Sequence, residues 1–471
     1  MTRRLDERAW ILSAGRTPDW DYVFRRRVAG SLARLPEIAK AYERDAPKAA
    51  RRKRHSRVLR WFHGARGAAR DRLAAHPAFD YWLYLWDRHF AVPAPSGEDN
   101  WRLQFGLFSG LAAALALSGK GVLELDATLD PDAHFHVYGT PFFVAFPKER
   151  ALSDLLVKIG PERVTLELAG GPKADIPRAA FSAPSPAREA AFGEATLHAS
   201  LPVSADMRVD TCGFLTTQGV VMHGLAAPSD PEKERFAAVL SRALAHVQER
   251  DPGLYAEMTD LVVSLVPLEN PKNYGSVSSS YVNMRGTICL SHADDPLLQA
   301  ETLIHEFCHQ KMNQLLLVDP VLAPGQAGQV FFSPWRPDAR RLRGLILGAH
   351  AFLNVAAYLI KSLSREEYDV QERVSVMLNV SRRLFEVDDA LRTVCGYASF
   401  TDFGARFILG MCRETQKAFH AVQWFPAEVL KEARTAVEKN RAAHALPLLG
   451  IHKAEGFKAK VDQVRFKQAA A

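Results

Sequence analysis

The chain has few cysteines and no apolar run long enough to cross a membrane. Its five cysteines among 471 residues are odd in number and scattered, which predicts reduced thiols without a disulfide framework or an iron–sulfur cluster. The longest apolar stretch, residues 105–117, is shorter than the about 20 residues that span a bilayer. The charged N-terminus has no apolar segment, so we expect no signal peptide. We therefore expect a cytoplasmic protein with no membrane partner.

The overall composition is that of a folded globular chain. Hydrophobic residues make up 48% and charged residues 24%, a balance that excludes a disordered or fibrous protein. The length predicts two or three structural units, at ~150 residues for each. The sequence contains no internal repeat and no low-complexity linker.

The net charge of +7 comes from one region, the basic segment (residues 48–72). It holds ten Lys and Arg residues and a single acid, Asp71. One interpretation is a solvated helix face or loop. The other is a docking patch for an acidic partner, such as a leader peptide or a nucleic acid. Because no nucleic-acid-binding motif accompanies the segment, we expect no nucleic-acid partner.

Apolar spacing along the chain predicts a mainly helical α+β fold in three regions. Residues 1–120 show helical spacing and a dense aromatic stretch at 77–86, and residues 226–471 return to long helices. Residues 121–225 are β-rich, with short apolar runs that Gly and Pro separate. The strands expected there are 122–126, 135–138, 142–146, 164–168, 195–201 and a short run at 220–222. Two more, 261–266 and 287–290, are expected in the C-terminal region.

The most informative pattern is an HExxH motif, residues 305–309. A spacing of four places His305 and His309 on one face of a helix, one turn apart, so that both imidazoles can bind one metal ion. The helix has suitable start signals, because Asp294 or Asp295 can cap it and Pro296 fits its first turn. The C-terminal region is therefore predicted to be a metal-binding catalytic region. The alternative is a surface helix with two incidental histidines.

A metal site needs a third ligand. The HExxHxxG extension is absent, because Met312 stands where that turn needs glycine. The best candidate is His350, on a nearly apolar helix that Asp338 could cap, although a lone histidine there is also typical of a satisfied core residue. Three glutamates are rival ligands of the kind found in zinc peptidases. These are Glu366, Glu367 and Glu372.

Four arginines lie between the motif and His350, at positions 336, 340, 341 and 343. Guanidinium groups bind carboxylates through paired hydrogen bonds, so this cluster could hold a small carboxylate ligand. The other interpretation is a solvated basic start of the second helix, although basic residues there oppose the helix dipole.

Three segments, residues 305–316, 333–340 and 344–352, carry a family resemblance. They resemble the HExxH-motif proteins of gene clusters for ribosomally made peptide natural products (RiPPs), and the match is tight over roughly residues 280–360. The resemblance implies a non-haem Fe(II), 2-oxoglutarate-dependent dioxygenase whose fold is not a double-stranded β-helix. The implied reaction is hydroxylation of a β-carbon in a precursor peptide, and the implied partners are that peptide and maturation enzymes of the same cluster.

Residue by residue, the resemblance implies that His305, His309 and His350 bind the iron. It also implies that Arg336 and Arg340 match the arginines that would bind 2-oxoglutarate. Glu306 would then orient a ligand or the substrate.

The residues alone do not select iron. Imidazole ligands suit zinc equally, three histidines depart from the usual two-histidine, one-carboxylate iron site, and HExxH is typical of zinc peptidases. In a zinc metallopeptidase Glu306 would be the general base. A third hypothesis is a structural metal protein that binds a precursor peptide without turnover. In either enzyme, residues 278–290 are a candidate edge for peptide binding by β-strand addition.

Overall fold

A computed structural model gives the fold. It describes residues 5–13, 15, 17–45, 49–89, 98–119, 121–182, 189–210, 226, 229–270, 276–326, 329–364 and 368–452. Among the described residues, helices account for 58% and strands for 18%, so the prediction of a mainly helical α+β fold is confirmed. The strand expected at 220–222 lies outside the described residues.

The chain forms two compact units that are interleaved along the sequence. The mixed unit comprises residues 20–246 and 256–310, and the helical unit comprises residues 1–19, 247–255 and 311–471. The motif residues His305, Glu306 and His309 belong to the mixed unit, whereas Arg336, Arg340 and His350 belong to the helical unit. The three sequence regions stay a prediction.

The mixed unit begins with helices that enclose an aromatic core. Phe62, Phe79, Trp82 and Phe108 are fully buried there, with Trp82 and Phe108 ring centroids 4.7 Å apart. These rings come from three helices. Their helical positions account for the helical spacing of aromatic residues in this part of the sequence. The helices are α2 (Pro18–Ala33), α3 (Leu35–Asp45), α4 (Ala49–Gly64), α5 (Ala68–Ala74), α6 (Pro77–His89) and α7 (Glu98–Leu117).

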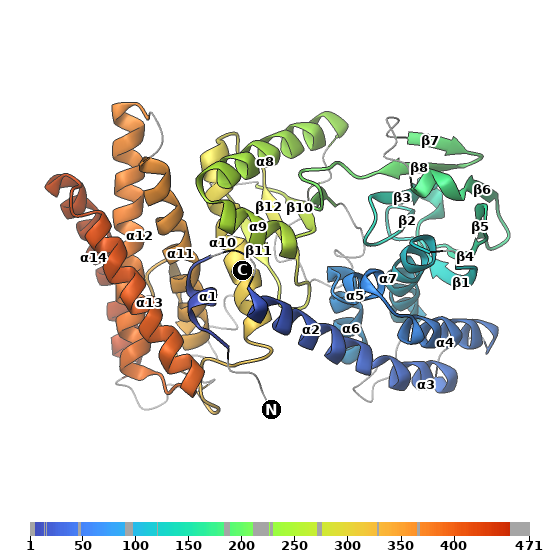
Figure 1. The fold of residues 1–471 in the computed structure, drawn as a ribbon, viewed down its shortest axis with the longest axis horizontal. Coiled ribbons are helices and arrows are strands. Elements are labelled where there is room, and N and C mark those ends of the chain that lie inside the picture. The colour runs from blue at the N-terminus through green and yellow to red at the C-terminus, as the bar shows by residue number, and fades with distance from the viewer. Residues whose placement is uncertain are drawn as a thin grey trace. The chain divides into compact units, whose positions relative to one another are not determined.

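Two antiparallel sheets follow these helices (Figure 1). Strands of the first sheet alternate buried and half-buried residues, as expected for a sheet with one face on a core. The first sheet has the order β1 (Leu123–Thr128), β4 (Asp154–Ile159), β5 (Arg163–Leu168), β6 (Lys173–Pro177). The second has the order β2 (His134–His136), β3 (Phe142–Ala145), β8 (Ala195–Ala199), β7 (Glu189–Phe192). Two short 3-10 helices, η1 (Lys148–Arg150) and η2 (Arg178–Phe181), lie between strands.

A third sheet precedes the motif helix. Its central strands β10 (Ser264–Leu268) and β12 (Thr287–Ser291) are parallel and completely buried, as is typical of parallel strands. Strand β9 (Arg208–Val209) lies at one edge, and β11 (Ser278–Ser280) pairs antiparallel with β12 at the other. The strand expected at 261–266 begins only at Ser264, because α9 continues to Leu261. The neighbouring helices are α8 (Asp230–Arg250), α9 (Pro252–Leu261) and α10 (Pro296–Leu315).

The helical unit is built from long helices that run side by side in Figure 1. Helix α12 packs against α11, α13 and α14, and it begins with a capping box between Asp369 and Glu372. The unit's elements are α1 (Arg8–Ile11), β13 (Val330–Ser333), β14 (Arg336–Arg341), α11 (Leu342–Leu363), α12 (Val370–Tyr397), α13 (Asp402–Ala421) and α14 (Ala427–His452).

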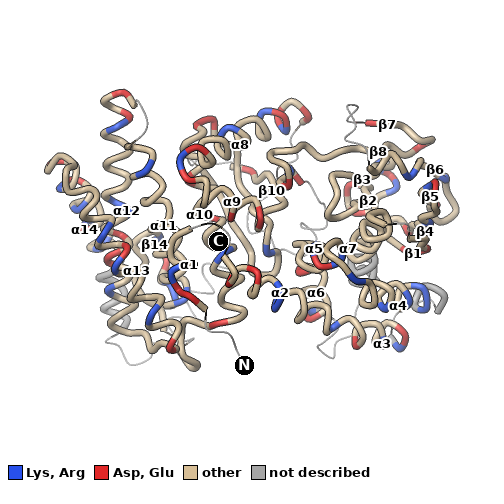
Figure 2. Tube along the Cα trace, viewed as in Figure 1, with Lys and Arg blue, Asp and Glu red and all other residues tan. Residues whose placement is uncertain are grey.

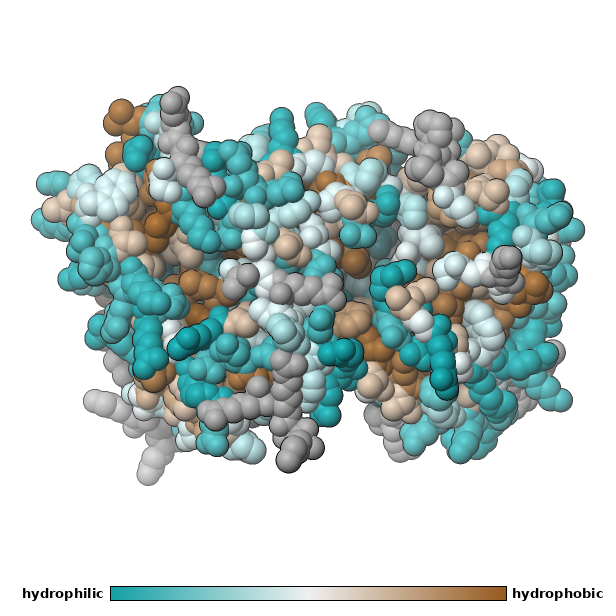
Figure 3. Space-filling model, in the orientation of Figure 1, coloured by the Kyte–Doolittle hydropathy of each residue, from teal (hydrophilic) through white to brown (hydrophobic). Residues whose placement is uncertain are grey.

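Helix α11 is long and apolar enough to cross a membrane by length and composition. However, 67% of its most apolar window is buried inside the structure, which is typical of a core helix. The face of the molecule in Figure 3 is mostly hydrophilic, with apolar residues scattered over it.

Candidate functional site

The motif helix α10 starts as the sequence predicts. Pro296 is its first residue, and Oδ1 of Asp295 accepts a hydrogen bond of 2.8 Å from the backbone N–H of Leu297. Asp294 instead accepts from His292, so Asp295 is the capping residue of the two candidates. The apolar side chains of the helix are fully buried. These are Leu303, Ile304, Phe307, Cys308 and Met312.

The two motif histidines converge as a metal site requires. Their Nε2 atoms lie 3.0 Å apart, and their rings are nearly perpendicular. Two imidazole nitrogens bound tetrahedrally to one zinc ion at ~2.05 Å would be separated by roughly 3.3 Å. The side chains of His305 and His309 therefore fit a bound metal with only a small adjustment.

Glu306 is buried and is held by the edge strand of the third sheet. Its exposed fraction is 4%, and its Oε1 accepts a hydrogen bond of 2.7 Å from Oγ of Ser278 on β11. Its Oε2 is buried and has no hydrogen-bond partner among the described residues. An unsatisfied buried carboxylate oxygen is costly, so its presence points to a bound ligand, water or substrate.

Gln310, next to the motif, fixes the helix to the start of β12. Its side-chain amide donates to the carbonyl oxygen of Thr287 at 2.8 Å and accepts from the N–H of Gly286 at 3.2 Å. Gly286 has a φ of +100°, and a Cβ there would lie 2.8 Å from the carbonyl oxygen of Leu261. These contacts position the motif helix against the sheet that ends in β11.

His350 is completely buried within the helical unit. Its Nε2 lies 2.7 Å from the carbonyl oxygen of Trp10. Because a carbonyl only accepts, Nε2 carries the proton and Nδ1 carries the lone pair. The neighbouring Asn354 donates to the carbonyl oxygen of Ile11 at 2.9 Å. An oriented N–H of this kind is typical of metal-bound histidines and of satisfied core histidines alike, so the ligand role stays a prediction.

Of the three glutamates that rival His350, Glu372 alone lies among the described residues. Glu372 is exposed and engaged in capping α12, where its carboxylate accepts from the N–H of Asp369 at 3.2 Å. Glu366 and Glu367 lie outside the described residues.

The arginine segment differs from the sequence expectation. Residues 336–341 form strand β14, and α11 begins at Leu342 with Arg341 at its N-cap, so Asp338 is not the cap of that helix. The interpretation as a basic helix start therefore applies to Arg341 and Arg343, at the N-cap and in the first turn of α11, but not to Arg336 and Arg340, which lie in the strand. The pairing of β14 with β13 shifts register between Phe331 and Ser333, and in this irregular strand the carboxylate of Asp338 contacts the guanidinium groups of both Arg336 and Arg340.

Asp338 lies between the two arginines. The Nε of Arg336 is 2.7 Å from one of its oxygens, and the Nε of Arg340 is 3.0 Å from the other. Burial and the charge of Arg336 lower the pKa of Arg340. Two arginines therefore share one carboxylate, an arrangement that shows they can approach a carboxylate ligand together.

Most of the basic segment lies in α4 and α5 (Figure 2). Arg66 lies between the two helices, and Lys48 lies outside the described residues. Part of its charge is paired: Arg54 contacts Asp126 at 2.9 Å, and Arg60 contacts Glu43 at 2.5 Å. The exposed cations Lys53, Arg57, Arg66 and Arg72 face solvent. A docking role for these residues stays a prediction.

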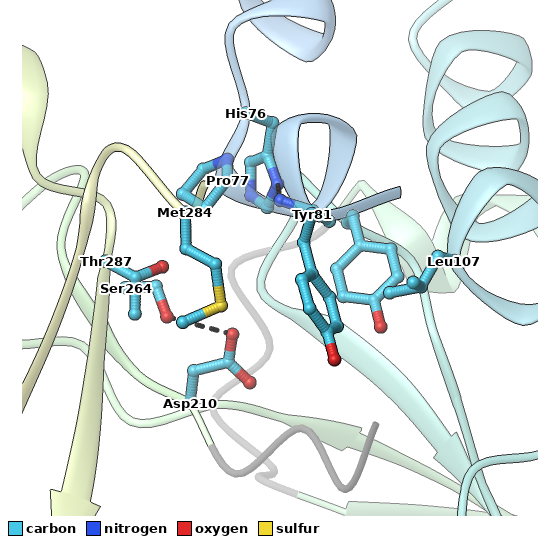
Figure 4. A pocket seen from close by; sticks show the side chains of 10 residues that line it. His76, Pro77, Tyr81, Leu107, Asp210, Ser264, Met284 and Thr287 are labelled. Atoms are coloured by element: carbon cyan, nitrogen blue, oxygen red, sulfur yellow. Dashed lines mark hydrogen bonds between the residues drawn. The ribbon is translucent and has the colours of Figure 1, made fainter. Parts of the chain in front are cut away.

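One small cavity of the mixed unit contains polar groups (Figure 4). His76 and Asp210 line it, and Oγ of Ser264 donates to the Asp210 carboxylate at 3.0 Å. Burial lowers the pKa of His76 to about 4. None of the three motif residues lines this cavity, so it is not part of the motif site.

A second group of potential metal ligands was missed by the sequence analysis. Asp130, His134 and His136 bring three ligand atoms within 4.8 Å of one another. The signal that could have found them is a His-x-His pair in a short strand, with an aspartate four residues before the first histidine.

Comparison of the sequence with models of known protein families gives no match, and comparison with curated proteins gives none either.

Proposed function

We propose that this protein is a non-haem Fe(II), 2-oxoglutarate-dependent oxygenase that hydroxylates a β-carbon of a residue in a ribosomally synthesised precursor peptide. The observation that carries the proposal is the 3.0 Å separation of the His305 and His309 Nε2 atoms beside a buried Glu306. This geometry supports a metal centre. The resemblance of the motif, arginine and His350 segments to the HExxH proteins of RiPP clusters supports iron and 2-oxoglutarate.

In this proposal His305, His309 and His350 hold the metal. When bound, Fe(II) with 2-oxoglutarate would activate O2, which is the oxidant for C–H hydroxylation. Imidazole nitrogen is a suitable donor for Fe(II) as well as Zn(II). The contribution of the chain is to orient these ligands, and the hydrogen bond from His350 Nε2 to Trp10 leaves Nδ1 as the donor atom.

Arg336 and Arg340 are proposed to bind the distal carboxylate of 2-oxoglutarate. Support comes from the carboxylate of Asp338, which already contacts the Nε atoms of both arginines. A bidentate guanidinium–carboxylate pair gives both affinity and orientation. Asp338 would have to share or release one arginine when the ligand binds.

The precursor peptide is proposed to bind along strand β11. This strand is the edge of its sheet, so one side of its backbone is available for antiparallel or parallel pairing with an extended peptide. Ser278 on this strand donates to Glu306, which links the proposed peptide edge to the motif. The proposal also includes a fold that is not a double-stranded β-helix, a cytoplasmic location and maturation enzymes of the same cluster as partners.

The main alternative is a zinc metallopeptidase. Its support is the buried, unpartnered Oε2 of Glu306, which suits a general base that accepts a proton from metal-bound water. The same histidine pair would hold zinc.

One experiment separates the two. Apo-protein is loaded with Fe(II) under anaerobic conditions, 2-oxoglutarate is added, and the visible spectrum is recorded. The oxygenase predicts a charge-transfer band that requires both Fe(II) and 2-oxoglutarate. Absence of the band, together with tight binding of Zn(II) and hydrolysis of peptides, would reject the oxygenase in favour of the peptidase.

A further inference from the structure

Asp130, His134 and His136 form a compact cluster in the mixed unit that shares no residue with the HExxH motif. His134 and His136 are the two ends of strand β2, and strand alternation places them on the same face of the sheet. Between them, Phe135 points to the opposite face and is buried in the core. Asp130 precedes the strand in a tight turn and is completely buried.

The separation of the donor atoms fits a metal ion. His136 Nε2 and Asp130 Oδ2 are 3.1 Å apart, close to the roughly 3.0–3.4 Å expected for two ligands that each lie ~2.1 Å from one metal. The ligand atom of His134 lies within 4.8 Å of both. The His134 side chain is half-buried.

The carboxylate of Asp130 is oriented toward the histidines by its own turn. Its Oδ1 accepts hydrogen bonds of 2.8 Å from the backbone N–H groups of Asp132 and His134. These bonds leave Oδ2 directed at His136. The His136 ring is held in place by stacking on Tyr138 and Phe143, with centroids 5.6 and 5.4 Å away. Side chains that are already fixed lose less conformational entropy when a metal binds.

A simpler role for the cluster is an ion pair between His136 and Asp130 that stabilises the turn. That role does not use His134, whose Nδ1 is buried and has no hydrogen-bond partner among the described residues. A buried ring nitrogen without a partner costs free energy that a bound ligand would recover. His134 therefore distinguishes a binding site from a structural ion pair.

We propose that Asp130, His134 and His136 bind one divalent transition-metal ion of the Zn(II) class, at a second site that is independent of the HExxH motif. Two imidazoles and one carboxylate are donors that such ions prefer, whereas Ca²⁺ and Mg²⁺ prefer oxygen ligands alone. Water or a small ligand would complete the coordination. Metal binding through Nε2 of His136 would replace the hydrogen bond between His136 and Asp130, because a metal-bound imidazole nitrogen carries no proton.

The test uses full-length apo-protein in which His305 and His309 are both replaced by alanine, so that the motif site cannot contribute. Co(II) is titrated into this protein and followed by its visible ligand-field absorption, and Zn(II) is then used to displace it. We expect about one bound ion per chain and, for four- or five-coordinate Co(II), an intense absorption band. Adding His134→Ala should lower the affinity at least about 100-fold.

The matched control is His198→Ala. This histidine lies on β8 of the same sheet, stacks on Phe143 and pairs with Glu189, but it is not one of the three ligands. It should leave the Co(II) spectrum and affinity unchanged. A protein that binds no ion in the His305/His309 double variant, or that loses affinity equally with His198→Ala and His134→Ala, would overturn the proposal. Circular dichroism of each variant distinguishes lost binding from lost folding, and Asp130→Asn gives a second, isosteric test of the ligand set.

Discussion

Oγ of Ser278 donates a hydrogen bond of 2.7 Å to Oε1 of Glu306, so the edge strand of the third sheet holds the glutamate of the HExxH motif. The other oxygen, Oε2, is buried and has no hydrogen-bond partner among the described residues. The two oxygens of this carboxylate therefore differ in their surroundings.

Replacement of Ser278 by alanine should release this carboxylate. A hydrogen bond to a charged group contributes about 1.5–3 kcal/mol, so turnover should fall roughly ten- to a hundredfold if orientation of Glu306 matters. Metal affinity should change little, because Ser278 donates to Glu306 and is not one of the proposed metal ligands. Turnover and metal binding are measured in parallel, and Ser278→Thr, which keeps the hydroxyl, should restore much of the activity. Equal losses in both variants would mean that the hydroxyl is not the cause.

Replacement of Glu306 by glutamine separates the two enzyme classes. A peptidase needs the carboxylate as a base and should lose essentially all turnover. An oxygenase has no such need, and we expect it to retain measurable hydroxylation, because glutamine can still accept from Ser278. The assay is mass spectrometry of a peptide substrate, which distinguishes a gain of one oxygen from cleavage. The control is the metal content of the variant, which should equal that of the unaltered protein.

The motif helix was predictable because its information is local. Asp295, Pro296 and the spacing of His305 and His309 lie within fifteen residues of one another, and helix geometry alone converts that spacing into convergent side chains. The support given by Ser278 and Gln310 was not predictable from spacing, because it depends on the pairing of β11 with β12 and on the position of α10 against this sheet.

The structure of the arginine segment, in contrast, was not predictable from local sequence. Its four arginines suggested the start of a helix, but residues 336–341 pair with β13 and form a strand. The sequence Arg336-Pro337-Asp338 contains a proline directly after the first arginine, which is tolerated at the edge of a two-stranded sheet. In the β-rich region, four strands were not expected: β4, β6, β7 and β9. Their apolar alternation is short or interrupted by charge, so it becomes decisive only when the strands pair. The position of His350 in a different compact unit from the motif is likewise a tertiary property that periodicity does not encode.

Replacement of Gln310 by alanine should destabilise the mixed unit. The variant leaves the N–H of Gly286 and the carbonyl of Thr287 buried without their partner, and each lost partner costs about 1–3 kcal/mol. We expect a lower midpoint of urea denaturation, measured by circular dichroism. Arg235→Ala, an exposed position on α8 in the same unit, should change the free energy of unfolding by no more than about 0.5 kcal/mol. An unchanged midpoint in the Gln310 variant would show that water replaces both bonds.

Replacement of Arg336 or Arg340 by alanine tests the 2-oxoglutarate site. Loss of a paired guanidinium–carboxylate contact should weaken 2-oxoglutarate binding at least about tenfold in one or both variants. Arg341→Ala is the matched control, because this arginine of β14 is exposed and is not one of the two proposed to bind 2-oxoglutarate. Affinity is measured by titrating 2-oxoglutarate into the Fe(II)-loaded protein. The assignment fails when both the Arg336 and the Arg340 variants keep normal affinity.

A pair of variants decides whether His350 is a metal ligand or a core residue. His350 and Asn354 both hydrogen-bond to the N-terminal segment, through the carbonyl oxygens of Trp10 and Ile11. His350→Ala and Asn354→Ala should therefore both lower stability, by about 1–3 kcal/mol for the lost bond and more for the cavity at His350.

Only a ligand role predicts a further difference between the two. As a ligand, His350 contributes to metal affinity, so His350→Ala should weaken Fe(II) or Zn(II) binding by at least about a hundredfold, whereas Asn354→Ala should leave it within about tenfold. Binding is measured by competition with a chelator at a temperature where both variants are folded. Similar metal affinities in the two variants would mean that His350 is a core residue and not a ligand. The third ligand would then be expected among the carboxylates.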